Sequence, residues 1–316
     1  MASGGDEMNV FLTGATGAIG PATVRGLLGK GHRVRAVART DEKAADLREL
    51  GAEPIAVDLF DGDAVKGAVD GCDAVLHLAT NVPVMRKMRS RDGWSMHNRL
   101  RTTANELLID AALTAGARTY VKESVTFGYP DRGDAWIDET TPPDESIAML
   151  QPTLEGERMV DRFTAEGGRG VVLRFGSFYG PAARMVDEAL RLARWRMSIL
   201  AGSPDGYVSS IHTDDVAGAA VAALDAPAGV YNVVEDEPAT RREYLDAFSR
   251  AFGLRKLRPM PSWLVRLAGG SGAQAVIRSQ RVSNKKLRDA TGWSPRFRSV
   301  REGWPAVAQA REASSA

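Results

Sequence analysis

A glycine-rich segment near the start of the chain places the strongest constraint on the fold. The segment TGATGAIG (Thr13–Gly20) follows the apolar run Asn9–Leu12 and precedes Ala22–Leu28, whose apolar residues recur at helical spacing. Between a strand and a helix, such glycines allow a tight turn, bring backbone amides close to a pyrophosphate, and let helix and strand pack closely. The helix start adds unpaired N–H groups that attract the anion. The sequence therefore predicts a dinucleotide-binding turn formed by Gly14, Thr16, Gly17, Ala18, Ile19 and Gly20.

Apolar runs and helical segments alternate through the first half of the chain, which is typical of a parallel sheet flanked by helices. The expected strands are Asn9–Leu12, Val34–Ala38, Pro54–Val57, Ala74–Leu78, Thr119–Val121, Gly170–Arg174 and Val230–Val233. The expected helices include Ala22–Leu28, Thr102–Thr114, Met185–Trp195, Asp215–Leu224 and Arg241–Phe252. We predict an α/β fold in which residues 1–177, with parts of 206–235, form a Rossmann-type doubly wound parallel sheet domain that binds the dinucleotide. Residues 178–316 mainly form a smaller, interleaved C-terminal substrate lobe.

The end of the second predicted strand indicates which dinucleotide binds. An acidic residue is expected about 20 residues after the glycines when the ribose carries a free 2′-hydroxyl. Here Ala38 occupies that position and Arg39 follows it. A guanidinium pairs with a 2′-phosphate, which a carboxylate would repel. We therefore expect NADP(H) rather than NAD(H), the alternative being that Arg39 is a solvated residue at a strand end.

The third predicted strand ends in the sequence AVDLF, which offers a contact for adenine. Asp58 is placed to accept a hydrogen bond from the adenine amino group, and Leu59 is placed to pack beside the ring. The alternative is that Asp58 caps the helix that follows.

Composition argues against several classes of function. The net charge is +1, whereas nucleic-acid-binding proteins concentrate positive charge, so no nucleic-acid partner is expected. No apolar run approaches the roughly 20 residues that cross a bilayer, and MASGGDEMNV lacks the layout of a signal peptide. The single cysteine, Cys72, fits a buried position in a protein of a reducing compartment. We therefore expect a cytoplasmic protein. The histidines are scattered singly along the sequence, so we expect no metal site.

Several further motifs occur in an order that resembles the extended short-chain dehydrogenase/reductase family, which includes NAD-dependent epimerases, dehydratases and ketone reductases. They are HLAT (His77–Thr80), RFGSFYGP (Arg174–Pro181), HTDDV (His212–Val216) and GVYNVVEDEPATRREYLDAF (Gly229–Phe248). The resemblance implies that the cofactor's phosphates and ribose are lined by Leu78, Ala79 and Thr80, and its nicotinamide by Phe175, Gly176 and Ser177. Because the family often dimerises through a four-helix contact, the resemblance is compatible with a homodimer.

The chain departs from this family where the family carries its catalytic Tyr-x-x-x-Lys pair. With Glu157 aligned to the family's glutamate, Met149 takes the tyrosine position and Thr153 the lysine position. The family's lysine lowers the pKa of the tyrosine so that the phenol exchanges a proton near neutral pH, which Met and Thr cannot do. The family's catalytic Ser/Thr has no clean counterpart, since Ser124 and Thr126 flank one of its expected positions. The chain is therefore identified as an atypical member, with Ser124 and Thr126 as candidate catalytic hydroxyls.

Reduction of a ketone needs a positioned hydride and a group that neutralises the developing alkoxide. The protein groups that could supply the proton are Ser95, His97, Ser124, Thr126, Tyr129, Tyr179, Tyr207 and His212. Structural roles also explain Tyr179, as a packed aromatic, and His212, as a lobe contact. The other source is the substrate, because a phenol beside a ketone carries its own hydrogen-bond donor. A large flat ring system would then face Met149, Thr153, Ser95 and Tyr207, and Met adapts well to aromatic rings.

Together these features favour an NADPH-dependent ketoreductase that acts on a polycyclic aromatic polyketide of the angucyclinone type in antibiotic biosynthesis, with substrate-assisted protonation. The resemblance supports this reading, because atypical reductases of this kind tailor polyketide antibiotics. The main alternative is a catalytically silent NADPH-binding sensor or scaffold protein. A nucleotide-sugar epimerase or dehydratase, or an isomerase or cyclase, are weaker alternatives. The basic segment Val82–Ser95 is either a flap over the substrate or a loop that leads into a helix.

Overall fold

The computed structural model describes residues 7–83, 91–181, 183–269 and 273–315. The chain forms two compact units. Unit 1 comprises Met1–Ser124, Pro152–Leu173 and Ala217–Val230, and unit 2 comprises Val125–Gln151, Arg174–Val216 and Tyr231–Ala316. Segments of the two units therefore alternate along the sequence, as an interleaved fold requires. The predicted division of binding roles at residue 177 stays a prediction.

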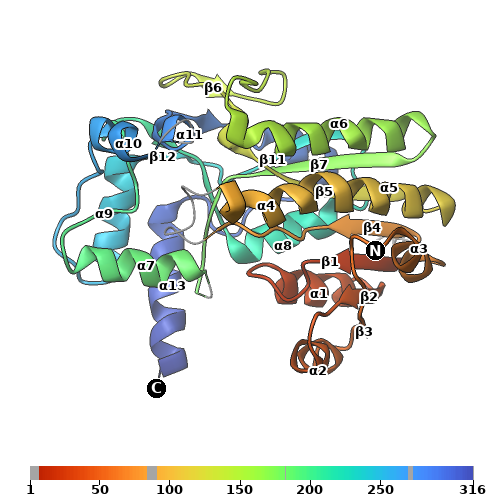
Figure 1. The fold of residues 1–316 in the computed structure, drawn as a ribbon. Coiled ribbons are helices and arrows are strands. Elements are labelled where there is room, and N and C mark those ends of the chain that lie inside the picture. Colours follow the sequence, from red (N-terminus) through yellow and green to blue (C-terminus); the bar gives the residue numbers. More distant parts are fainter. Residues whose placement is uncertain (1–6, 84–90, 182, 270–272, 316) are drawn as a thin grey trace. The chain divides into compact units, whose positions relative to one another are not determined.

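A seven-stranded parallel sheet in the order β11-β7-β5-β4-β1-β2-β3 organises the fold (Figure 1). All seven predicted strands are confirmed: β1 (Asn9–Thr13), β2 (Arg33–Val37), β3 (Glu53–Ile55), β4 (Ala74–His77), β5 (Thr119–Val125), β7 (Arg169–Phe175) and β11 (Gly229–Val233). The strand order runs outward in both directions from the β1–β4 pair, which makes the sheet doubly wound and places its switch point there. Ligands of such sheets bind beyond the carboxyl ends of the strands at this point.

Helices cover the sheet of unit 1, and the strand order determines which face each covers. The helices are α1 (Gly20–Gly29), α2 (Asp41–Glu49), α3 (Gly62–Val69), α4 (Arg91–Arg99), α5 (Asn105–Thr114), α6 (Gln151–Ala165) and α8 (Thr213–Ala222), of which α6 and α8 have one end in unit 2. Because α1 and α3 connect strands in opposite directions, right-handed crossovers place them on opposite faces. On the α3 face, Val65, Leu108 and Phe163 pack with Phe11 and Tyr120 in one buried apolar cluster (Figure 1).

Unit 2 consists of short strands and helices. Its strands pair as β8 (Ser177–Tyr179) with β10 (Ser210–His212), β9 (Tyr207–Val208) with β12 (Ala239–Thr240), and β6 (Trp136–Ile137) with β13 (Arg281–Val282). Its helices are α7 (Arg184–Ala193), α9 (Arg241–Ala251), α10 (Ser262–Gly269), α11 (Ala273–Ile277), α12 (Lys285–Thr291) and α13 (Val300–Ser315).

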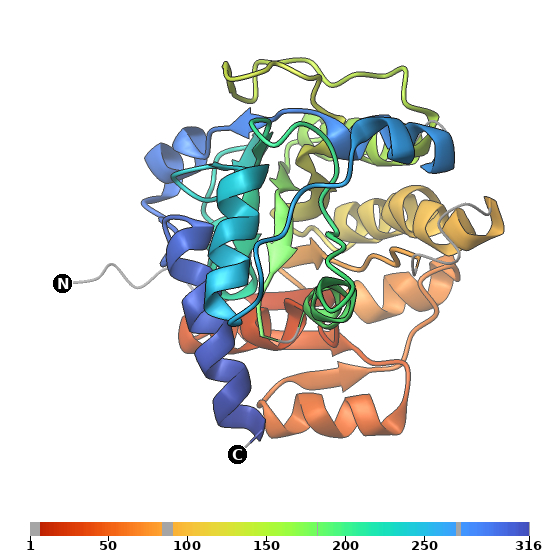
Figure 2. The same ribbon diagram turned by 90° about the vertical axis from the view of Figure 1, so that its left-hand side faces the viewer.

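An aromatic cluster around Trp304 forms the core of unit 2. Helices α9 and α13 lie side by side (Figure 2), and Trp304 of α13 is buried between them. Its ring centroid lies 4.8 Å from that of Tyr179, 5.6 Å from Tyr244 and 4.9 Å from Phe248. Aromatic side chains each bury a large apolar area, and tilted or edge-to-face contacts add to it. This cluster therefore holds the C-terminal helix to the rest of unit 2.

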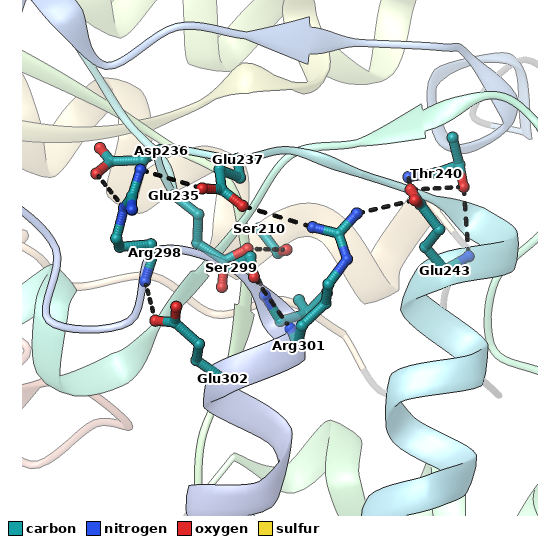
Figure 3. Close-up of polar contacts among 11 residues, drawn as sticks. Ser210, Glu235, Asp236, Glu237, Thr240, Glu243, Arg298, Ser299, Arg301 and Glu302 are labelled. Carbon is teal, nitrogen blue, oxygen red and sulfur yellow. Dashed lines mark hydrogen bonds and ion pairs between the residues drawn. The ribbon is translucent and has the colours of Figure 1, made fainter.

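A ladder of ion pairs runs along the surface of unit 2 at the start of the same two helices (Figure 3). Arg301 contacts Glu243 at 2.8 Å and Glu237 at 3.7 Å, while Arg298 contacts Glu237 at 3.1 Å and Asp236 at 3.7 Å. The Arg298 side chain is 60% exposed, so each of its pairs contributes about 0–1 kcal/mol.

Candidate functional site

The glycine-rich turn packs closely on its surroundings because two of its glycines leave no room for a side chain. Gly14 has a φ of +81°, and a Cβ there would lie 2.7 Å from the carbonyl carbon of Leu78. A Cβ at Gly20 would overlap the Ala15 carbonyl, so the first turn of α1 packs directly on the loop. The predicted strand–turn–helix unit is therefore confirmed, with its backbone held against the end of β4 through Leu78.

The phosphate-facing side of this turn is open. Gly17 and Ala18 are exposed and Thr16 is half-buried, whereas Ile19 and Gly20 are buried. A Cβ at Gly17 would meet only the Gly14 carbonyl oxygen, at 3.2 Å. The exposed part of the loop, Gly17 and Ala18, thus leaves an open approach toward the start of α1, and a helix N-terminus attracts a pyrophosphate. A bound nicotinamide dinucleotide would supply hydride chemistry, and these residues would hold its phosphates.

The ribose end of the candidate site carries one exposed cation. Ala38 is buried and donates its N–H to the Ile55 carbonyl, and Thr40 caps α2 by accepting from the Lys43 N–H. Arg39 lies between them with an exposed side chain, and forms no ion pair with another described residue. A guanidinium so placed is compatible with a 2′-phosphate, which it can bind through two parallel hydrogen bonds.

The loop after β3 shows that the alternative role of Asp58, as the cap of the next helix, was wrong. Asp58 accepts a hydrogen bond from the Phe60 N–H at 3.0 Å, and the N-cap of α3 is Asp61, which accepts from Asp63 and Ala64. Asp58 therefore does not cap that helix. Its exposed carboxylate remains a candidate partner of adenine, and the half-buried Leu59 packs against the apolar cluster of unit 1.

A directed chain of hydrogen bonds connects the ends of β1 and β4. The Ala79 N–H donates to the Thr13 hydroxyl at 3.2 Å, and Thr13 Oγ1 lies 2.8 Å from His77 Nδ1. His77 Nε2 lies 2.9 Å from the Leu100 carbonyl, to which it can only donate. Burial, with the nearby charge of Lys122, lowers the pKa of His77 to about 3, so the ring is neutral. This chain fixes the predicted cofactor-lining segment His77–Thr80 to the glycine turn.

A second buried chain of hydrogen bonds runs through Arg101, the residue after Leu100. Arg101 lies in a π-helix, η2 (Leu100–Ala104), between α4 and α5, where the sequence predicted a regular helix from Thr102. Its Nε donates to His97 Nε2 at 2.8 Å, and its Nη2 contacts Glu123 Oε1 at 2.8 Å. The other nitrogen of His97 lies 3.3 Å from the Thr80 hydroxyl. Burial and Arg101 lower the pKa of His97 to about 3, so at neutral pH this candidate donor is a neutral imidazole and not an imidazolium acid.

Lys122 is a buried lysine on β5. A Cβ at Gly156 of α6 would lie 2.6 Å from Lys122 Cε, so the lysine stem occupies the space left by this glycine. Its Nζ donates to the Glu123 carbonyl at 3.4 Å. Burial lowers the pKa of Lys122 to about 7, with Arg101 adding to the effect and Glu123 and Glu157 opposing it.

Ser124 lies two residues further along β5, on the same face as Lys122. Its hydroxyl donates to Glu157 Oε1 on α6 through a short hydrogen bond. Thr153, one turn before Glu157, is buried on the same helix. Unit 1 therefore brings Ser124, Thr153, Glu157 and Lys122 to one place at the carboxyl end of the sheet.

Unit 2 holds the remaining candidate residues. Phe175 and Gly176 are buried and Ser177 is half-buried, with the N–H of Gly176 donating to Val233 and that of Ser177 to Ser209. Thr126 is buried in a 3₁₀ turn, and Met149 is half-buried against Ile147 and Leu150.

Two other predictions concern the segment before α4. Ser95, predicted to face the substrate, is exposed on α4. Of Val82–Ser95, predicted as a flap or a loop, residues 84–90 lie outside the described residues, and 91–95 belong to α4.

Comparison with known proteins identifies the family. Residues 10–234 match the model of the NAD dependent epimerase/dehydratase family. The chain belongs to this family. It is an NAD(P)-dependent oxidoreductase whose relatives include named reductases.

Three relatives illustrate this family membership. A 3-diazoavenalumate denitrifying reductase from a Streptomyces species is 33% identical over 309 residues, which cover 94% of this chain and 99% of the relative. The 4-hydroxy-2-methyl-3-oxo-4-farnesyl-3,4-dihydroquinoline-1-oxide ketoreductase of Stigmatella aurantiaca is 27% identical over 261 residues, covering 78% and 74%. The crystal structure of human epimerase family protein SDR39U1 with NADPH superimposes with a TM-score of 0.77 at 25% identity, covering 96% and 99%.

Most tyrosines of this epimerase/dehydratase-family chain are poorly suited to donate a proton. Burial raises the pKa of five of them, namely Tyr120, Tyr129, Tyr179, Tyr231 and Tyr244. The sixth, Tyr207, is half-buried, and the Arg281 guanidinium lies 5.0 Å from its ring centroid. A general acid works best with a pKa near the working pH, so raised values oppose that role.

His212 has a packing role in unit 2. Its ring lies 5.4 Å from that of Tyr179 and 4.5 Å from that of Phe297, and its Nδ1 accepts from the Asp214 N–H. Burial lowers the pKa of His212, so the buried ring is neutral near pH 7.

Sequence reasoning missed three charged residues of the site, Arg101, Lys122 and Glu123. Two of them stand in the strand β5, just after the predicted strand Thr119–Val121. Charges inside a strand that is buried on both faces are a signal in themselves, because they require partners. Over the described part of the chain, no helix is long and apolar enough to cross a membrane. Within the same residues, no group of three or more His, Cys, Asp and Glu side chains is arranged to hold a metal ion.

Proposed function

We propose that this chain is an NADPH-dependent ketoreductase that reduces a polycyclic aromatic polyketide of the angucyclinone type, and that a phenol of the substrate supplies the acid. The proposal is carried by the sequence around the start of α6, where alignment on Glu157 assigns the family's Tyr position to Met149, in the 3₁₀ turn before the helix, and its Lys position to Thr153. The five tyrosines with raised pKa values offer no replacement. A cytoplasmic location and a role in antibiotic biosynthesis are parts of the same proposal.

The choice of NADPH rests on the ribose end of the site. Arg39 is exposed, engages no described carboxylate, and follows Ala38 where an NAD-selective chain would carry an acid. The human relative bound to NADPH supports the same choice. Gly14–Gly20, Asp58, Leu59, Leu78–Thr80 and Phe175–Ser177 would complete the cofactor site.

The reaction balances without a protein acid. Bound NADPH would supply the hydride for the carbonyl carbon, and the electron pair of the C=O π bond would move to oxygen. The adjacent phenol donates its proton to that oxygen, and the resulting phenolate takes a proton from water. The chain's own residues align the two reactants and exclude water, and such alignment alone can supply about 7–11 kcal/mol of the barrier.

The Streptomyces relative favours a second candidate, an aromatic diazo compound, because it is similar over almost its whole length. Hydride added to the terminal nitrogen of an aryl diazonium gives an aryl diazene, which loses N₂ and leaves hydrogen on the ring. This step also needs no tyrosine, since the nitrogen leaves as a neutral molecule. The Stigmatella ketoreductase favours the ketone.

Isotope transfer distinguishes the two candidates. Purified protein with [4-²H]NADPH would be given a hydroxyanthrone, its O-methyl ether and a diazophenol, with NADPH oxidation followed by absorbance. The proposal predicts oxidation with the hydroxyanthrone and deuterium on the new carbinol carbon. Deuterium on an aromatic carbon from the diazophenol alone would favour the second candidate. NADPH binding without oxidation by any acceptor would favour the sensor or scaffold.

Single substitutions of the remaining hydroxyl and imidazole candidates complete the test. Tyr129→Phe, Tyr179→Phe, Tyr207→Phe and His212→Asn are each expected to keep hydride transfer, apart from losses of stability at the buried positions. A variant that folds and binds NADPH but transfers no hydride would show that the protein, and not the substrate, supplies the proton.

A further inference from the structure

Unit 2 contains two sequence segments that carry no carboxylate. Residues 189–204 and 247–288 together hold 13 Lys and Arg residues and no Asp or Glu, although the whole chain has 41 of the former and 40 of the latter. The net charge of +1 therefore conceals a strongly basic region. Charge asymmetry of this kind indicates a negatively charged partner.

The fold brings these two acid-free segments side by side (Figure 2). Ala201 and Met260 form a parallel bridge, in which the Met260 N–H donates to the Leu200 carbonyl at 2.8 Å. On the N-terminal side of this bridge, Met197 and Leu257 line one small cavity. The residues that flank Met197 and Leu257 therefore belong to one surface of unit 2.

We call this surface the basic face. It consists of exposed residues from both segments, namely Arg194, Trp195, Arg196, Met197, Arg255, Lys256 and Arg258. Among its cations, Lys256 pairs with Asp246 at 3.6 Å, and the four arginines form no ion pair with a described carboxylate. Trp195 is 77% exposed, the largest fraction for any large hydrophobic residue that the structure describes, and Met197 is 47% exposed. Four available guanidinium groups therefore accompany two protruding apolar side chains.

Backbone conformation shows that Arg196 is not the residue best suited to its position. The turn that ends α7 closes with the Met197 N–H on the Leu192 carbonyl at 3.1 Å, and Arg196 within this turn has a φ of +57°. Glycine usually occupies the left-handed position of such a helix end, because it lacks the Cβ that makes this conformation unfavourable. Arg196 is the one non-glycine residue with a positive φ in the described part of the chain. Folding alone therefore does not account for this arginine, whereas a binding role does.

The composition of the basic face favours a lipid bilayer as its ligand. Each Lys or Arg near an anionic lipid surface strengthens binding by about fivefold. Tryptophan prefers the boundary between water and acyl chains, and long arginine side chains extend from there to the headgroups. A stable protein complex, by contrast, buries about 800 Å² on each partner around an apolar core. Two protruding apolar side chains do not provide a core of that size.

We propose that the basic face docks this protein on anionic phospholipid bilayers. Trp195 and Met197 insert at the level of the headgroups, and the four arginines pair with lipid phosphates. Such docking is peripheral and reversible, because it depends on few apolar side chains and on charge. The inference goes beyond the proposed function and does not depend on it. If both hold, docking places the enzyme where apolar ring systems accumulate.

Sedimentation with lipid vesicles provides the test. The full-length protein would be mixed with vesicles of phosphatidylcholine alone, or of phosphatidylcholine and phosphatidylglycerol in equal parts, and the bound fraction measured after centrifugation. We expect the protein to bind the anionic vesicles at least about tenfold more tightly than the neutral ones. High salt should abolish this difference, because it screens the charges of an exposed surface.

Matched double variants test the role of the charges. The variant with Arg194→Glu and Arg255→Glu is expected to bind anionic vesicles about 100-fold more weakly or worse, because two attractions become repulsions. The control carries Arg25→Glu on α1 and Arg48→Glu on α2, two exposed positions of unit 1, and has the same net charge. It is expected to bind within about threefold of the wild-type protein. Circular dichroism would show that each variant has folded.

Single variants test the apolar contact and the turn. Trp195→Ser is expected to weaken vesicle binding by about tenfold, whereas Trp136→Ser, at an exposed tryptophan of β6, should leave it unchanged. Arg196→Gly removes a cation and also relieves the left-handed backbone, so it should bind about fivefold more weakly while unfolding at the same temperature or higher. A purely structural role of Arg196 predicts the reverse pattern, a loss of stability without a loss of binding.

Three outcomes would overturn the proposal. The first is that the wild-type protein does not sediment with anionic vesicles. The second is that the basic-face variants and their controls lose equal affinity, which would remove the assignment to this surface. The third is binding to duplex DNA or to polyglutamate but not to vesicles, lost in the variant with Arg194→Glu and Arg255→Glu, which would assign the basic face to a nucleic acid or an acidic protein. None of these measurements uses turnover, so their failure is distinct from failure of the proposed reaction.

Discussion

Buried carboxylates occur in both units, but their partners differ in kind. In unit 1, Glu123 and Glu157 lie near two buried cations, Arg101 and Lys122, at the carboxyl end of the sheet. In unit 2, the partners of Glu235 among the described residues are neutral donors: the Tyr179 and Ser210 hydroxyls and the Val300 N–H (Figure 3 shows the Ser210 contact). Burial raises the pKa of Glu235 to about 8, so near pH 7 it is largely protonated and serves packing. Buried carboxylates beside buried cations therefore distinguish the candidate site in unit 1, whereas the buried carboxylate of unit 2 has neutral partners and belongs to the packed core.

The largest expected loss of stability comes from breaking the buried ion pair of Arg101 and Glu123. Glu123→Ala leaves the Arg101 guanidinium buried without its carboxylate, and such losses typically cost about 3–5 kcal/mol of folding free energy. The matched change in unit 2 is Arg298→Ala in the exposed ion-pair ladder, with an expected cost of at most about 1 kcal/mol for each of its two pairs. Urea unfolding followed by circular dichroism would measure both. Similar losses in the two variants would remove the distinction between the regions.

Gly156→Ala should give the next largest effect, because the added methyl group would overlap Lys122 and the Arg101 carbonyl. Overpacking of this kind costs about 1–3 kcal/mol. Gly67→Ala is the control, since a Cβ on that glycine of α3 would meet nothing within 4 Å, and alanine should stabilise the helix by about 0.5–1 kcal/mol. Thermal unfolding of both variants is the measurement. Equal stability would show that Lys122 does not depend on the gap at Gly156.

The exposed arginines of the two units should also behave differently. Arg301 in unit 2 is occupied by Glu237 and Glu243, whereas Arg39 in unit 1 pairs with no described carboxylate. Arg39→Glu is expected to weaken NADPH binding by about tenfold or more and to leave NADH binding nearly unchanged, because the proposed pairing of the guanidinium with the 2′-phosphate would be replaced by repulsion. Arg48→Glu on α2 is the control, and fluorescence titration is the measurement. Equal losses for both cofactors would assign Arg39 a structural role.

The two units should also show pH dependences of stability with opposite signs. The folded pKa of Lys122 is lowered to about 7 from an ordinary 10.5, so the unfolded chain binds more protons between these values and stability rises with pH there. The folded pKa of Glu235 is raised to about 8 from 4.5, so the folded chain binds more protons and stability falls between pH 4.5 and 8.

Two substitutions isolate these dependences. Lys122→Met should remove the rise in stability above pH 7, and Glu235→Gln should reduce the fall below pH 8. The free energy of unfolding would be measured from pH 5 to 10 by urea titration. The comparison would be contradicted if Lys122 and Glu235 changed the free energy of unfolding in the same direction as the pH rises.

The sequence was sufficient for the sheet and the glycine turn because both are local. Short runs of three to five residues predicted every strand of the sheet, and the segment Thr13–Gly20 predicted the turn. Conformation there depends on neighbours within a few positions, such as the αL backbone that Gly14 requires.

The charged cluster was not predictable in the same way, because its partners are distant in sequence. The predicted strand Thr119–Val121 stopped before Lys122 and Glu123, since charged residues are expected outside a buried strand. The observed β5 continues to Val125, because Arg101 and Glu157 approach those charges from η2 and α6. The π-helix that positions Arg101 has no marker in the sequence either.

The central claim is that hydride transfer relies on an acid carried by the substrate, and one rate comparison tests it most directly. Single-turnover transfer from NADPH would be followed by stopped flow for a ketone with an adjacent phenol and for its O-methyl ether. The account predicts that methylation slows hydride transfer by about 100-fold or more, the scale of a general-acid contribution. Equal rates for the two ketones at saturating concentration would contradict it.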